Sequence, residues 1–187
     1  MAAVTAAMVK ELREMTGAGM MDCKKALAAT DGDMDAAVDF LREKGLAGAQ
    51  KKAGRIAAEG IVDVCVSDDA KKAVVLEVNA ETDFVAKNEK FRTYVGEVAA
   101  QALKTSASTT EEFLNEKWEL DPSLTVGEKL SSMISIIGEN MTIRRFAKVE
   151  ENDGCVVSYI HAGGKIGVLV DVVSDVVNDD IKEMAKN

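Results

Sequence analysis

The sequence has very little of several residue types. It contains one histidine, one proline and three cysteines among 187 residues, and aromatic residues make up 4% of the chain. Because the only histidine, His161, falls in a predicted hairpin turn, one chain can assemble neither a Ser-His-Asp triad nor a metal site with several histidines. The cysteines are scattered without CxxC spacing, which predicts free thiols in a reducing compartment.

The chain also lacks an excess of positive charge and any long apolar run. Its 23 Lys and Arg residues are outnumbered by 32 Asp and Glu residues, for a net charge of -9. Proteins that bind nucleic acid or anionic membranes usually carry excess Lys and Arg, so neither is predicted as a direct partner. No window approaches the roughly 18 apolar residues of a spanning helix. We expect a cytoplasmic protein, or one of an organelle matrix or stroma if its natural precursor carries a transit peptide.

Residues 1–45 are predicted to form a module of three short helices. Apolar residues recur at helical spacing over residues 4–16, Met21 to Ala29 is rich in alanine, and a third stripe begins at Met34. The intervening TGAG and TDGD are typical of turns. A unit this small has a thin core, so it carries modest stability alone or leans on a partner.

Residues 46–57 are predicted to be a basic linker helix. Lys51, Lys52 and Arg55 occur there, and the apolar residues between them keep helical spacing. Two interpretations stay open, because short charge runs do both: a solvated face that connects two domains, and a contact with an acidic surface of a partner.

Residues 58–150 are predicted to form a core subdomain of strands and helices. IVDVCV and AVVLEV are β-branched runs joined by the polar SDDAKK, which predicts a hairpin. Helical spacing then recurs over residues 91–102, 111–120 and 130–137, and MTIRRFAKVE alternates as a strand does. The predicted fold class is α+β.

The predicted hairpin occurs twice. GIVDVCVSDDAKKAVVLEV, from Gly60, and GCVVSYIHAGGKIGVLVDV, from Gly154, share a glycine start, an apolar run, a polar turn ending in lysine and a second apolar run. The first copy continues into a long amphipathic helix, whereas the second is followed only by VSDVVNDDIKEMAKN. Residues 151–187 are therefore predicted to be the start of a second subdomain, which is incomplete.

Three carboxylates lie close together in the sequence after the first hairpin. Glu77, Glu81 and Asp83 could bind a hard cation or act as an acid and base pair, as in a metal-assisted hydrolase. The competing interpretation is structural, since Glu77 alternates with core positions of a strand and Thr82 or Asp83 sits where a helix N-cap belongs. The GGK at 163–165 lacks the flanking residues of a phosphate loop, and no cofactor or bound metal is predicted.

Phe84 raises the sharpest question, because it stands beside a carboxylate at the end of a strand. A phenylalanine at a strand-to-helix junction is most often buried. Three consecutive residues cannot all face inward at a turn, however, and a protruding aromatic next to Asp83 would be a wedge for an apolar pocket of a partner. Both interpretations stay open on the residues alone.

Five segments, in this order, resemble the bacterial and organellar elongation factor Ts family: VKELREMTGAGMMDCKKAL, KKAGRIAAEG, NAETDFVAKNEKF, GENMTIRR and SYIHAGGKIGVLV. The resemblance covers nearly the whole chain. It implies a guanine-nucleotide exchange factor for the GTPase elongation factor Tu, without an active site for covalent chemistry. It also implies a core of two related subdomains, and an N-terminal module similar to ubiquitin-associated (UBA) domains that docks on the GTPase.

The resemblance also implies roles for particular residues. The Asp83-Phe84 pair is expected to enter the GTPase near its Mg²⁺ and phosphate site. The expected partner contacts are Thr82, Asp83, Phe84, Val85 and Asn88 for exchange, Leu12, Met20 and Met21 in the N-terminal module, and Ile137 and His161 in the core.

The sequence departs from the family pattern in two ways, and these leave the assembly and the function open to alternatives. Longer family members continue beyond the region where this sequence stops, and some short members dimerise, so both self-association and a two-to-two assembly with the GTPase are considered. In the second repeat the position matching Asp83 is Val176, so only the first copy can act as the wedge. The alternative function is a protein-interaction scaffold that uses the UBA-like module and has no effect on nucleotide.

Overall fold

The computed structural model describes residues 4–186 and has a mixed α+β fold. The chain divides into two compact units. The first contains the residues up to Arg55 together with Gly127–Asn140, and the second contains Ile56–Val126 together with the residues from Met141 onward. Among the described residues, no helix is both long and apolar enough to cross a membrane.

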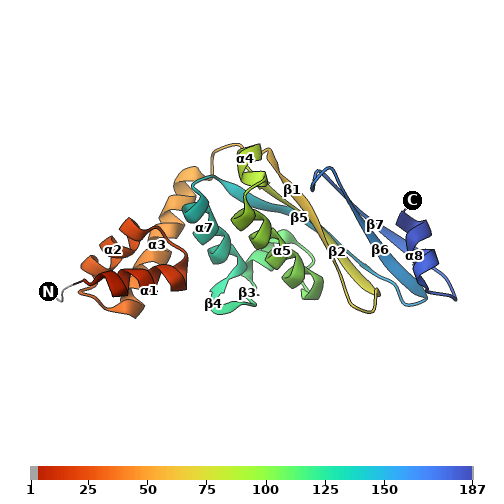
Figure 1. Cartoon of the computed structure of the whole chain (residues 1–187), viewed down its shortest axis with the longest axis horizontal. Coiled ribbons are helices and arrows are strands. Elements are labelled where there is room, and N and C mark those ends of the chain that lie inside the picture. The colour runs from red at the N-terminus through yellow and green to blue at the C-terminus, as the bar shows by residue number, and fades with distance from the viewer. Residues whose placement is uncertain (1–3, 187) are drawn as a thin grey trace. The chain divides into compact units, whose positions relative to one another are not determined.

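The first unit is helical. Its helices are α1 (Ala6–Thr16), α2 (Met20–Ala29), α3 (Met34–Lys52) and α7 (Val126–Ile137) (Figure 1). The first three are consecutive, and α7 comes from a later part of the sequence. The N-caps Thr5 and Asp33 each accept a backbone N–H of the first turn, as N-cap residues do. The small core contains Val9, Leu12, Cys23, Ala26, Leu27 and Ala37, which confirms the thin core expected from the sequence.

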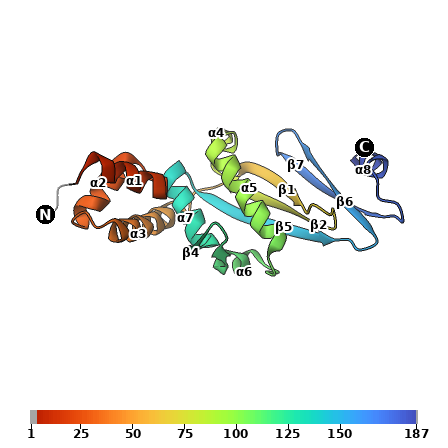
Figure 2. The ribbon, with the colours of Figure 1, turned by 60° about the horizontal axis from the view of Figure 1, so that its bottom comes forward.

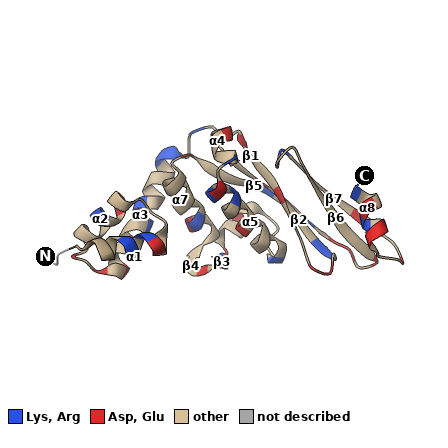
Figure 3. Cartoon of the chain, in the orientation of Figure 1, with Lys and Arg blue, Asp and Glu red and all other residues tan. Residues whose placement is uncertain are grey.

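Helix α3 differs from the prediction, because one helix replaces a short third helix and a separate linker helix over 46–57. Gly45 and Gly48 lie within α3 and face α7, where a Cβ at Gly45 would lie 3.9 Å from Ser132 Cα. The two glycines therefore lie inside the helix at its contact with α7 and do not end it. Lys51 and Lys52 lie in its last turn (Figure 3), where positive charge offsets the helix dipole.

The second unit is built on an antiparallel sheet in the order β1-β2-β5, with β1 at Glu59–Val66, β2 at Lys72–Ala80 and β5 at Met141–Glu150. The sheet confirms the first predicted hairpin and the predicted strand MTIRRFAKVE. Helices α4 (Asp83–Ala86) and α5 (Glu89–Lys104) follow β2, and both pack on β1 and β2 (Figure 2).

The segment predicted as a helix over 111–120 is mostly not helical. Helix α6 covers only Thr110–Asn115 and is followed by the short strands β3 (Lys117–Trp118) and β4 (Asp121–Thr125). The side-chain amide of Gln101 in α5 donates to the carbonyl of Lys117 and accepts from the N–H of Glu119. Tertiary hydrogen bonds to α5 thus hold the backbone extended, which local helical spacing does not reveal.

The second predicted hairpin is confirmed as β6 (Gly154–His161) and β7 (Ile166–Val173), paired antiparallel. It lies against β1 and β2 and shares their core. The stretch after it, for which no helix was named from the sequence, contains α8 (Asp179–Lys186), which contacts both strands.

The hairpin and α5 cover opposite faces of the sheet. Val62 lies against Gly167 of β7, whereas the carboxylate of the next residue, Asp63, lies beside Gly96 of α5. Successive strand residues point to opposite faces. A Cβ at Gly167 would lie 2.4 Å from Val62 Cγ1, so the hairpin approaches β1 closely only because this residue has no side chain.

Two Gly→Ala substitutions should therefore have opposite effects on stability. Gly167→Ala forces Val62 to move in a packed interface and is expected to lower the free energy of unfolding by about 1–3 kcal/mol. Gly96→Ala places its methyl group in ordinary contact, 3.8 Å from Asp63, and should raise the free energy by roughly 0.5–1 kcal/mol by favouring the helix. Urea denaturation followed by the fluorescence of the single, buried Trp118 measures both. Equal shifts of the two variants would contradict the close approach.

Candidate functional site

The loop after β2 forms one turn of helix with an exposed phenylalanine. Thr82 caps α4, its Oγ1 accepting the N–H of Val85 at 3.4 Å. Val85 and Ala86 are 9% and 3% exposed, whereas Phe84 is 80% exposed. A single helical turn presents residues on different sides, so burial of Val85 and Ala86 directs Phe84 outward. The structure thus decides between the two interpretations of Phe84, which protrudes.

Asp83 places a negative charge beside this ring. Its Oδ2 accepts from Lys87 Nζ at 2.7 Å, one helical turn away. This hydrogen bond and the charge of Lys87 lower the pKa of the Asp83 carboxyl, and the ammonium of Lys165 acts in the same direction. The pair is open to solvent, so Asp83 stays ionised at neutral pH without being buried against another group.

Asn88 fixes the other end of α4. Its Oδ1 accepts the backbone N–H groups of Lys90 at 2.9 Å and Phe91 at 3.3 Å, which makes it the N-cap of α5. Phe91 is fully buried. TDFVAKN therefore encodes two helix N-caps around one turn, and the buried Phe91 anchors the segment that exposes Phe84.

The three carboxylates of the hydrolase hypothesis do not form a cluster. Glu77 accepts from Arg145 Nε at 2.8 Å and from Asn79 Nδ2 at 3.0 Å, whereas Asp83 pairs with Lys87. Within residues 4–186 no three His, Cys, Asp or Glu side chains gather as a metal site would require. The geometry gives these carboxylates structural partners and offers no support for metal-assisted hydrolysis.

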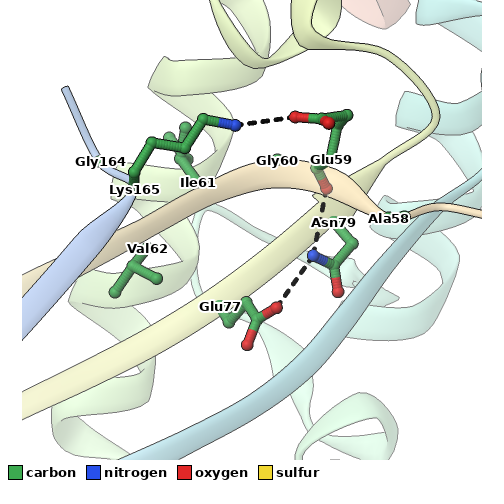
Figure 4. Close-up of a pocket in the computed structure, with 9 residues that line it drawn as sticks. All are labelled: Ala58, Glu59, Gly60, Ile61, Val62, Glu77, Asn79, Gly164 and Lys165. Atoms are coloured by element: carbon green, nitrogen blue, oxygen red, sulfur yellow. Dashed lines mark hydrogen bonds and ion pairs between the residues drawn. The ribbon is translucent and has the colours of Figure 1, made fainter. Parts of the chain in front are cut away.

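The turn of the second hairpin brings His161 into the same unit as Phe84. His161 is exposed, and its Nδ1 lies 2.9 Å from the hydroxyl of Tyr159. Beside this turn is a shallow pocket of about 120 Å³ lined by residues 58–62 of β1 and its approach, Glu77 and Asn79 of β2, and Gly164 and Lys165. Figure 4 shows Lys165 paired with Glu59 at 2.7 Å and Glu77 accepting from the amide of Asn79 at 3.0 Å, so each charged side chain that lines the pocket has a partner.

The N-terminal module exposes methionines. Met20 and Met21, both predicted partner contacts, are 59% and 62% exposed at the start of α2. Leu12, predicted with them, is wholly buried in the core of the three helices and cannot be reached by a partner. Met15, on the same apolar stripe as Leu12, is 58% exposed and was not among the predicted contacts. We call Met15, Met20 and Met21 the methionine patch.

The remaining predicted contact, Ile137, is the last residue of α7 and is partly buried in the first unit. The structure thus groups the candidates in two sets. Met20, Met21 and Ile137 lie in the first unit, and the Asp83-Phe84 turn and His161 lie in the second. The roles of all of these residues in binding stay predictions.

The chain is similar to known proteins along its length. The family model described as elongation factor TS matches residues 81–187, and the UBA/TS-N domain model matches residues 4–41. Elongation factor Ts of Clostridium botulinum strain Alaska E43 is 55% identical over 183 residues, and that of Halothermothrix orenii is 52% identical over 179 residues. These matches cover 98% and 96% of this chain. The chain spans about 60% of the length of the curated relatives it matches.

The exposure of Phe84 predicts that it contributes little to folding. Phe84→Ala should change the free energy of unfolding by less than about 0.5 kcal/mol, because the ring is 80% exposed. Phe91→Ala, the matched control seven residues along the chain, removes a fully buried ring and should cost about 3–5 kcal/mol. Urea denaturation measures both. A large loss for Phe84→Ala would mean that the ring packs in the fold.

Proposed function

Because this chain belongs to the elongation factor Ts family, we propose that it is a guanine-nucleotide exchange factor that binds elongation factor Tu in its GDP form and promotes GDP release during translation elongation. The observation that carries this proposal is Phe84, 80% exposed on a capped helical turn beside an ionised carboxylate. The three cysteines are free thiols, which fits action in a reducing cytoplasm.

In this proposal Phe84 supplies the packing energy for displacing the elements that hold Mg²⁺. Moving a phenylalanine side chain from water into an apolar pocket is worth about 1.5–3 kcal/mol. Its backbone is already held by the caps at Thr82 and Asn88, so little conformational entropy is lost on binding. A rigid, exposed aromatic is the usual anchor of a protein interface.

Asp83 brings the charge. Mg²⁺ in a GTPase holds the nucleotide phosphates and demands near-ideal octahedral geometry. A carboxylate placed near that site disturbs the water and side-chain network around the ion, and the neighbouring ring displaces the elements that carry it. Loss of Mg²⁺ contacts weakens the hold on GDP. Neither residue forms or breaks a covalent bond, so the protein acts as a binding partner and not as an enzyme.

Thermodynamic linkage couples the binding of this protein and of GDP to the GTPase. Whatever factor this protein removes from the affinity of the GTPase for GDP, GDP removes from the affinity of the GTPase for this protein. The complex of all three is therefore short-lived, and rebinding of either nucleotide expels the factor.

The methionine patch supports a second contact with the same GTPase. Methionine side chains are flexible and polarizable, and they adapt to a partner's apolar surface. Three of them lie exposed around the end of α1 and the start of α2. The same observation favours the alternative function, an interaction scaffold that binds through this module without an effect on nucleotide. Nucleotide release separates the two functions.

We expect this protein to accelerate release of a fluorescent GDP analogue from elongation factor Tu in a stopped-flow experiment. Phe84→Ala should lower the rate constant at saturation by about tenfold or more, the usual effect of losing an anchor residue. Leu120→Ala is the control, because Leu120 is an exposed apolar residue, 67% exposed, between β3 and β4. With this variant, the rate constant of GDP release from elongation factor Tu should stay within about twofold of the value with the wild type. Unchanged release with the wild-type protein, although it binds, would favour the scaffold.

Substitutions in the methionine patch should affect docking and not the exchange step. Met20→Ser with Met21→Ser should raise the half-saturating concentration roughly tenfold and leave the maximal rate constant within about twofold of the wild type. Met184→Ser in α8 is the matched control, since Met184 is also exposed, at 64%. A fall in the maximal rate alone would contradict a docking role for the patch.

A further inference from the structure

Strand β1 is an edge strand of the sheet β1-β2-β5. Backbone groups on the free edge of such a strand have no strand partner and need another one. The N–H of Val62 donates to the carbonyl of Gly164 at 2.7 Å. Gly164 belongs to the turn between β6 and β7, residues 162–165, which we call the hairpin tip. The tip therefore closes the edge of β1 at this point.

Two side chains also fasten the hairpin tip. Arg92 Nη2 donates to the carbonyl of Gly163 at 2.7 Å, and Lys165 Nζ lies 2.7 Å from Glu59 Oε2 (Figure 4). Both side chains come from positions near α4. In the pairing of β1 with β2, Glu59 lies opposite Ala80, the last residue of β2 before the α4 turn. Arg92 lies in the first turn of α5, which follows α4. The tip is thus bound to α5, which follows α4, and to the first residue of β1, which lies beside the end of β2 that precedes α4.

The hairpin tip lies directly on β1. Gly164 has φ of +99°, and a Cβ there would lie 3.1 Å from Ile61 Cβ and 3.2 Å from the carbonyl oxygen of Val62. At its other end the hairpin is held by the N–H of Val156, which donates to the carbonyl of Ala70 at 2.7 Å. Because both ends are fixed, the tip cannot swing freely away from α4.

Helix α4 needs such support. Four residues are far fewer than an isolated helix requires, and Phe84 gains almost nothing from the fold at 80% exposure. The position of Phe84 therefore depends on the elements around α4. The tip also acts on the neighbouring charge, since the ammonium of Lys165 contributes to the lowered pKa of Asp83.

We propose that the hairpin tip braces the α4 turn for exchange, with Glu59, Arg92 and Lys165 as positioning residues. The proposal rests on the exchange function proposed above. It assigns a role to the hairpin of the second repeat. That repeat has Val176 where the first has Asp83, so it cannot act as a wedge itself. Bracing holds Phe84 in the orientation from which it acts on the Mg²⁺ site of the bound GTPase, so its loss lowers the rate of the exchange step and not the affinity.

Swapping the charges of Lys165 and Glu59 tests whether the hairpin tip supports the α4 turn. Lys165→Glu and Glu59→Lys each place like charges together, and the double variant restores an opposite pair. In the free protein, deuterium exchange at the backbone amides of Ala86, Lys87 and Asn88, which hydrogen bond within the turn, should be about threefold faster in each single variant. The double variant should return to the wild-type rate.

The same variants are then assayed for GDP release from elongation factor Tu. Each single variant should lower the rate constant at saturation about threefold with the half-saturating concentration within about twofold of the wild type, and the double variant should recover the rate. The matched control is the pair Lys72 and Glu150, 3.1 Å apart and similarly exposed where β2 meets β5. Charge exchange there should change neither readout.

Three results would overturn the brace: amide exchange unchanged in the single variants, faster amide exchange with no change in GDP release, or losses that the double variant does not restore. The last would mean that Lys165 or Glu59 acts through a different contact. If the wild-type protein does not accelerate GDP release, the proposed exchange function fails, and amide exchange in the free protein still decides whether the tip supports α4.

Discussion

The antiparallel pairing of β1 with β2 is the constraint on which the second unit depends. Its register sets Glu59 opposite Ala80, so the start of one strand lies beside the end of the other. The α4 turn leaves the sheet at that point, and the hairpin tip reaches the same end through Lys165. A shift of one residue would send every side chain of β1 to the opposite face. Val62 would then face α5, and Asp63 would face the second hairpin.

Phe84 departs from the usual rule that a large apolar side chain is buried. The surrounding segment follows local rules closely, with an N-cap at Thr82, an N-cap at Asn88 and a buried ring at Phe91. Sequences that agree with their fold everywhere except at one place commonly do so at a functional site. The fold supplies a firm backbone here and leaves the side chain for another molecule, which is the arrangement that a wedge requires.

One glycine sets how closely the second hairpin packs on the sheet. Gly167 lets the hairpin lie on β1, because a Cβ there would lie 2.4 Å from Val62 Cγ1. At Gly45 and Gly48 of α3, in contrast, a Cβ would make only ordinary contact with α7. The repeated hairpin thereby gains a role different from that of the first. The first copy leads into the exposed turn, and the second covers the sheet beneath it.

Much of this protein follows from its sequence alone. Alternating β-branched runs determined the hairpins, and the spacing of apolar residues determined α1, α5 and α7, because these patterns report local backbone geometry. Tertiary structure decided what local patterns cannot encode, namely which residues are covered. Leu12 and Met15 lie on one predicted stripe, yet one is buried and the other is 58% exposed. Likewise, Gln101 holds the short strand at Lys117–Trp118 and the turn after it, α3 continues through two glycines beside α7, and Val85 and Ala86 direct Phe84 outward. A face becomes core only when another element packs on it, and that element can come from a distant part of the chain.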